Sequence, residues 1–172
     1  MKKKKRAGIN CLVPFLFVIY MVLLVWIILF KLQLSIHDLD TVRNINLIPF
    51  HYENEIGMNF HLKEVLENIG IFIPFGIYLC MFRHEPNFKR KFILILSTSL
   101  ILEIFQYILA VGGTDITDLI TNTCGGMIGI GIYWSAAKIF RGKKRTDTVI
   151  TVVAAIVTVI VVGGVSVLLI SN

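Results

Sequence analysis

Five long apolar stretches dominate the chain, and short polar or basic segments separate them. Each stretch is close to the length of about 20 residues that an α-helix needs to cross the hydrocarbon core of a membrane. The stretches occupy residues 11–30, 65–82, 92–111, 119–140 and 148–170. This pattern predicts an all-α fold, a polytopic membrane helix bundle of about five transmembrane helices.

The polar segments divide the chain into three parts. A basic N-terminus covers residues 1–10, a membrane domain covers 11–140, and a basic linker with the fifth helix covers 141–172. The one long loop that we predict is 33–63, and loops of this length are often functional or partly structured. It contains an apolar patch, Asn46–Phe50, which we expect to dock on the bundle or to lie at the membrane interface.

Composition supports a membrane protein. Hydrophobic residues make up 56% of the chain and charged residues 16%, and the mean hydropathy is +0.78. A soluble domain has about 45–50% apolar and about 25% charged residues. These values exclude a secreted disulfide scaffold, a disordered chain and a coiled coil.

The positions of Lys and Arg predict the orientation. Five of them lie in residues 2–6, four in 83–91 and five in 138–145, so 14 of the 17 fall on one side of the membrane. Segments rich in Lys and Arg stay in the cytoplasm, which predicts the N-terminus inside and the C-terminus outside. The net charge of +6 is then a topology signal, and we expect membrane lipids, not nucleic acid, as partners.

Polar side chains interrupt the apolar stretches on three predicted helices. Ser99, Glu103 and Gln106 share one helix face by their spacing, and Asn68 and Pro74 interrupt the second helix. A polar and glycine stripe runs along the fourth helix: Asp115, Asp118, Asn122, Gly125 and Gly129. An ionisable group inside a membrane costs several kcal/mol, so it usually faces protein or water and often has a function.

We interpret the polar residues of these three helices as one candidate ligand-binding site in the outer half of the membrane. Its members are Asn68, Glu103, Gln106, Asp115, Asp118 and Asn122. We expect Glu103 to be protonated, or hydrogen-bonded to Gln106 and Asn122. The competing interpretation is structural, because amides and neutral acids also hold helices together.

Several of these residues also have purely structural interpretations. Thr114 or Asp115 is suited to cap the N-terminus of the fourth helix. Pro74 is expected to kink the second helix and to leave the Gly70 carbonyl without its helical hydrogen bond. The glycines of the fourth helix permit close helix packing.

Four motifs in order carry a family resemblance. They are Asn46-Leu47-Ile48-Pro49-Phe50, an N-x-x-x-F-x-P-x-G pattern over 68–76, E-x-x-Q over 103–106, and D-I-x-D-x-x-x-N-x-x-G-x-x-x-G over 115–129. With these motifs the chain resembles the VanZ-like family of bacterial membrane proteins, over about half of its length. The positions that we interpret as structural are Pro49, Pro74, Gly76, Gly125 and Gly129.

The resemblance implies a multi-pass protein of the bacterial cytoplasmic (plasma) membrane and cell envelope. It also implies an association with lowered susceptibility to glycopeptide antibiotics, especially teicoplanin. Our first functional hypothesis is therefore a non-enzymatic protein whose polar pocket binds an amphiphile, either a lipoglycopeptide tail or a cell-wall precursor lipid.

Two alternatives remain open. The first is an intramembrane enzyme acting on lipid headgroups or cell-wall precursors, with Glu103, Asp115 or Asp118 as general acid or base. No G-x-S-x-G, H-E-x-x-H or phosphate-binding loop accompanies them, and we expect no cofactor. A metal held by Glu103, Asp115 and His51 has weak support, so we expect none. The second is a small proton-coupled transporter, which needs a homo-oligomer formed through the fourth helix.

Overall fold

The computed structural model describes residues 2–30, 45–50, 55–82, 84–111 and 114–171. In these ranges the chain forms five helices and two very short strands. The elements are α1 (Lys2–Phe30), β1 (Ile45–Asn46), α2 (Glu55–Met81), α3 (Phe88–Leu109), β2 (Thr114–Asp115), α4 (Ile116–Ile139) and α5 (Lys143–Ser171). The predicted all-α bundle is confirmed.

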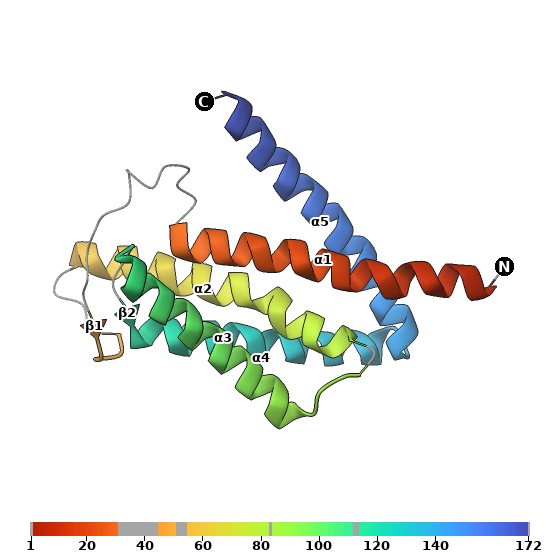
Figure 1. The fold of residues 1–172 in the computed structure, drawn as a ribbon. Coiled ribbons are helices and arrows are strands. Elements are labelled where there is room, and N and C mark those ends of the chain that lie inside the picture. The colour runs from red at the N-terminus through yellow and green to blue at the C-terminus, as the bar shows by residue number, and fades with distance from the viewer. Residues whose placement is uncertain (1, 31–44, 51–54, 83, 112–113, 172) are drawn as a thin grey trace.

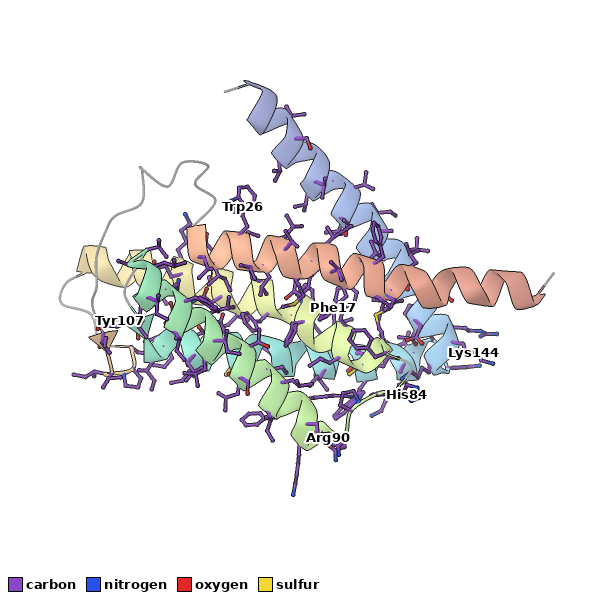
Figure 2. All side chains as sticks on the ribbon, in the orientation of Figure 1. Phe17, Trp26, His84, Arg90, Tyr107 and Lys144 are labelled. Atoms are coloured by element: carbon purple, nitrogen blue, oxygen red, sulfur yellow. The ribbon has the colours of Figure 1, made fainter. Side chains whose placement is uncertain are left out.

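Helices α1 to α4 lie alongside one another, and α5 leaves the bundle at an angle (Figure 1). The start of α1, the α2–α3 connection and the α4–α5 connection lie toward one end, which we call the basic end. The two strands and the start of α2 lie toward the other end, the β1–β2 end. Figure 2 shows the same separation in side chains: His84, Arg90 and Lys144 lie toward the basic end, and Tyr107 lies toward the opposite one.

Four of the helices are long and apolar enough to cross a membrane. Their apolar spans are Leu12–Leu29, Leu62–Met81, Phe88–Leu109 and Lys143–Val167, close to four of the five predicted stretches. The fourth predicted stretch forms α4, which is 24 residues long but less apolar, because polar and glycine residues line its packed faces. At 1.5 Å per residue, α4 is about 36 Å long, so its crossing stays a prediction based on length.

The predicted long loop is shorter in the structure. It holds β1, and α2 begins at Glu55, well before the predicted start of its apolar span. Residues 31–44 and 51–54 lie outside the described residues. Strand β1 pairs in parallel with β2, Ile45 opposite Thr114 and Asn46 opposite Asp115, so the backbone of this segment is attached to the end of the bundle.

Glycines allow α2 and α4 to pack at backbone contact. A Cβ added at Gly76 would lie 1.9 Å from the Gly126 carbonyl oxygen, and one added at Gly129 would lie 2.0 Å from the Ile73 carbonyl oxygen. Gly125 meets the Ile69 carbonyl oxygen in the same way, at 2.3 Å. The predicted close packing is therefore confirmed, and its partner is α2 of the same chain. A homo-oligomer through α4 stays a prediction that needs another face of this helix.

Aromatic side chains join α1 to α2. Phe17 lies 5.1 Å from Phe82 and 5.4 Å from Tyr78 between ring centroids, in edge-to-face geometries. The Tyr20 hydroxyl donates a 2.7 Å hydrogen bond to the Ile71 carbonyl oxygen. This contact lies in the turn before Pro74, where the proline removes a helical donor. The carbonyl that loses its helical donor to Pro74 is that of the neighbouring Gly70, so the Tyr20 bond joins α1 to α2 one residue beyond the interruption.

An ion-pair network around the buried Lys91 ammonium closes the basic end. The Lys91 ammonium is almost fully buried and forms an ion pair with Glu85. It also donates a 3.2 Å hydrogen bond to Cys80 Sγ and lies 5.7 Å from the centroid of the Trp134 ring. Lys143 Nζ lies 2.6 Å from the other Glu85 oxygen. Glu85 therefore links the start of α3 to the start of α5.

Glu85→Gln is expected to destabilise the protein far more than Glu67→Gln. It leaves the buried Lys91 ammonium without its anion, which costs about 1–3 kcal/mol. Glu67 pairs with Lys63 at 3.7 Å on an exposed surface, and such pairs contribute about 0.5 kcal/mol. Thermal unfolding of both variants in detergent micelles measures the difference. Equal stability of the two variants would contradict the network.

The ion pairs of Glu85 with Lys91 and Lys143 should make the stability of the protein depend on pH. Burial raises the pKa of Glu85, but hydrogen bonds from Lys143 and Lys91 outweigh this effect and leave the pKa below its ordinary value of 4.5. The folded-state pKa is thus lower than the unfolded-state pKa. The stabilisation is complete above the unfolded-state value and is lost as the pH falls through the folded-state value. The Glu85→Gln variant should lack this acid-induced loss.

Candidate functional site

The candidate site lies at the β1–β2 end, where α3 ends and α4 begins. Helix α3 stops at Leu109 because Ala110 adopts a left-handed conformation, with φ of 55°, and the Val111 N–H donates to the Gln106 carbonyl oxygen. The third apolar stretch was predicted to continue to Val111. This earlier reversal turns the chain back, so that the first residues of α4 lie beside the last turns of α3.

Asp115 connects three segments of this end. It is the N-cap of α4, as one of two predicted candidates, and its Oδ1 accepts a 2.7 Å hydrogen bond from the Thr117 N–H. Its Oδ2 accepts a 3.1 Å hydrogen bond from Asn46 Nδ2 of β1. Its own N–H donates to Glu103 Oε2 of α3, at 3.1 Å. Asp115 therefore has a structural role at the junction.

Glu103 is buried inside the protein, with 2% of its surface exposed. Besides the bond from the Asp115 N–H to Oε2, its backbone carbonyl accepts a hydrogen bond from Thr114 Oγ1, at 3.2 Å. Its other carboxyl oxygen, Oε1, is buried and has no hydrogen-bond partner in the described part of the chain. Among the described residues, the acid is thus held at one oxygen and unpaired at the other.

Of the two expectations for Glu103, the bonds to Gln106 and Asn122 are absent among the described residues, so that alternative was wrong, and a protonated Glu103 stays a prediction. Gln106 Nε2 instead donates a 3.1 Å hydrogen bond to the carbonyl oxygen of Ile28 in α1, and Asn122 Nδ2 donates a 3.0 Å hydrogen bond to Ser99 Oγ. The reason is the antiparallel course of α3 and α4. Asp115 contacts Glu103, and Asn122, two turns further along α4, contacts Ser99, one turn back along α3.

Asn68 and Asp118 join α2 to the site. Asn68 Nδ2 donates a 2.8 Å hydrogen bond to Asp118 Oδ1, and both side chains are half-buried. The structure therefore brings all six predicted residues to the contacts among α1 to α4, through separate pairs and not as one cluster of direct bonds. We call this set of contacts, with Asn46 and Ser99, the acid–amide network.

The network leaves a set of buried acceptors. Glu103 Oε1, Gln106 Oε1 and Asn122 Oδ1 are buried without partners among the described residues. All three atoms are oxygens that accept hydrogen bonds from neutral or cationic donors. Buried polar atoms in folded proteins are usually satisfied, so this interior is suited to groups that donate hydrogen bonds.

Besides Ser99, which contacts Asn122, two contributors were missing from the six predicted residues. Asn46 reaches Asp115, and Thr117 Oγ1 accepts a 3.1 Å hydrogen bond from the Phe50 N–H. Asn46 is part of a motif that we recognised, but nothing in its spacing reveals a partner 69 positions away. In the described ranges, no group of three or more His, Cys, Asp or Glu side chains is arranged to hold a metal. His51 lies outside those ranges.

Fold and site together define an α-helical membrane protein with an acid–amide network at one end of its bundle. The sequence profile of the VanZ/LLP1 family matches residues 17–141. A relative from Enterococcus faecium, Protein VanZ, is 41% identical over 147 residues, which cover 84% of this chain and 87% of the relative. The chain belongs to the VanZ/LLP1 family. No solved structure matches it.

Family membership confirms the resemblance that the motifs indicated. The matched region contains every residue of the acid–amide network. The protein is therefore a VanZ-like membrane protein.

Proposed function

We propose that this protein lies in the bacterial plasma membrane and lowers susceptibility to teicoplanin, by binding the polar part of an amphiphile at the acid–amide network. The observation that carries the proposal is the state of Glu103. A carboxyl group is buried within a membrane-crossing helix, and one of its oxygens has no partner among the described residues.

A purely structural role explains this arrangement poorly. Burying an acid in a membrane costs several kcal/mol, whereas hydrogen bonds between membrane helices contribute about 1 kcal/mol each. An acid that used both oxygens to join helices would recover more of that cost than Glu103 does. The unpaired oxygen favours a group that binds a ligand.

Charge supports the placement of the network on the outer side. Lys91 and Lys143 lie at the basic end, and Lys- and Arg-rich segments stay in the cytoplasm. The β1–β2 end then faces the outer leaflet, where a lipoglycopeptide tail or a cell-wall precursor lipid would reside. The three buried acceptors favour an amphiphile whose head carries hydroxyl, amide or ammonium donors.

Susceptibility profiles test the proposal. In a host that lacks its own copy, the wild-type gene should raise the inhibitory concentration of teicoplanin several-fold and change that of vancomycin less. Glu103→Ala and Asp118→Ala should lose this protection, and Glu103→Gln should show whether the acid itself is needed. Glu67→Gln is the matched control, because Glu67 is an exposed acid.

The amounts of each variant in the membrane must be compared, so that loss of protein is not mistaken for loss of function. Full teicoplanin protection by a Glu103→Ala protein at wild-type levels would contradict the proposal.

The enzyme and the transporter give different results. An enzyme using Glu103, Asp115 or Asp118 predicts that the Glu103→Ala strain accumulates an altered lipid or cell-wall precursor. The observation that favours a proton-coupled transporter is the buried acid of Glu103. Such a transporter predicts that protons enter vesicles together with the ligand. Protection without either change supports binding.

A further inference from the structure

A short apolar turn, Leu47–Phe50, projects from the β1–β2 end. Leu47 is 71% exposed, Ile48 59% and Phe50 50%, and residues 45–50 contain no charged side chain. Contiguous exposed apolar surface next to polar residues marks an interaction site. The turn therefore needs a partner that tolerates apolar side chains.

Two backbone donors of this turn, those of Ile48 and Phe50, are satisfied within the chain. The Ile48 N–H donates a 3.1 Å hydrogen bond to Asn46 Oδ1, and the Phe50 N–H donates a 3.1 Å hydrogen bond to Thr117 Oγ1. Pro49 between them has no N–H. Backbone outside a helix is tolerated at membrane depth only where protein satisfies its polar groups. The N–H groups of Ile48 and Phe50 meet that requirement, and Pro49 has no N–H to satisfy.

The turn also adjoins a surface that lipid covers. Strand β1 pairs with β2, and β2 contacts the end of α3 through the bond from Thr114 to the Glu103 carbonyl. The last two turns of α3, a membrane-crossing helix, expose several large apolar side chains: Ile104, Phe105, Ile108 and Leu109. Tyr107 lies at the same end (Figure 2), as tyrosines do at membrane interfaces.

We propose that the Leu47–Phe50 turn inserts into the interfacial layer of the leaflet at the β1–β2 end and contacts the acyl chains of phospholipids. Asn46, next to the turn, is bonded to Asp115, and the Asp115 N–H is bonded to Glu103. The anchored turn thereby fixes the depth of the acid–amide network relative to the lipid headgroups. This inference does not depend on the antibiotic phenotype.

Tryptophan fluorescence of the full chain in lipid nanodiscs tests this insertion. Phe50→Trp is made in a Trp26→Phe/Trp134→Phe background, so that the new residue is the only tryptophan. We expect blue-shifted emission that dibrominated phosphatidylcholine quenches strongly, more with bromine near the ester than near the chain end. Iodide in the buffer should quench it weakly. His84→Trp in the same background is the control, because His84 is exposed at the basic end, and iodide should quench it strongly.

Two outcomes would overturn the proposal. Iodide quenching of the Phe50→Trp protein as strong as that of the His84→Trp protein would place the turn in water. Bromolipid quenching that disappears when each disc holds two copies would show that a second copy covers the turn. If Phe50→Trp does not fold, Ile48→Trp takes its place, because Ile48 belongs to the same turn and is 59% exposed.

Discussion

Gly129→Ala is expected to destabilise the protein strongly, while Gly131→Ala on the same helix should not. A Cβ at position 129 would lie 2.0 Å from the Ile73 carbonyl oxygen of α2, whereas a Cβ at position 131 meets nothing within 4 Å. The obstacle at Ile73 is backbone, so no side chain can rotate away. Helices α2 and α4 must separate, and the contacts along their whole interface weaken.

The size of this effect follows from two opposing contributions. Overpacking costs about 1–3 kcal/mol in a well-packed core, and a backbone obstacle places Gly129→Ala at or above the upper limit. Replacing Gly by Ala inside a helix favours the helix by about 1 kcal/mol, so Gly131→Ala should be neutral or stabilising. We expect a difference of about 2 kcal/mol or more between the variants, seen as a lower unfolding temperature in micelles. Equal unfolding temperatures would contradict the α2–α4 packing.

Asp115→Ala should weaken the β1–β2 end as a unit. The substitution removes the N-cap of α4, which costs about 1–2 kcal/mol, and it leaves Asn46 Nδ2 without its acceptor. The N–H of residue 115 can still donate to Glu103, because that bond uses the backbone. We therefore expect a loss of about 2 kcal/mol in the free energy of unfolding, with a larger loss of protection for residues 45–50 against proteolysis.

Two further variants separate the contributions of Asp115. Asp115→Asn keeps a good N-cap acceptor but presents an amide to the amide of Asn46, so its loss should be smaller than that of Asp115→Ala. Asn46→Ala removes only the bond between the strands. The losses of Asn46→Ala and Asp115→Ala should be less than additive in the double variant, because both remove the same bond. Strict additivity would show that the two side chains do not interact.

The apolar stretches located the helices because membrane helices need an apolar length that the sequence displays directly. The N-cap of α4 was predictable for a similar reason, since Asp115 directly precedes the helix. The hydrogen-bond partners of Glu103, Gln106 and Asn122 were not predictable from the sequence. They depend on where α3 ends, and that end is set by a left-handed Ala110, a conformation that alanine does not signal.

The glycines illustrate the same limit at the level of packing. Their spacing on α4 indicated a helix approaching closely, but could not say which helix. The complementary glycine on α2, Gly76, came from a motif, and only the structure shows it against Gly126. The hydrogen bond from Gln106 to Ile28 of α1 could not be predicted from residue spacing either, because the two residues are 78 positions apart in the sequence.

The parallel pairing of β1 with β2 constrains the order in which the chain assembles. Strand β1 precedes α2, whereas β2 follows α3, so the ribosome must synthesise two more helices before the first strand meets its partner. Closing a connection of this length is slow compared with forming local helices. Strand β1 must therefore wait for its partner, and nascent chains that stop before Thr114 should be the forms most exposed to quality-control proteases.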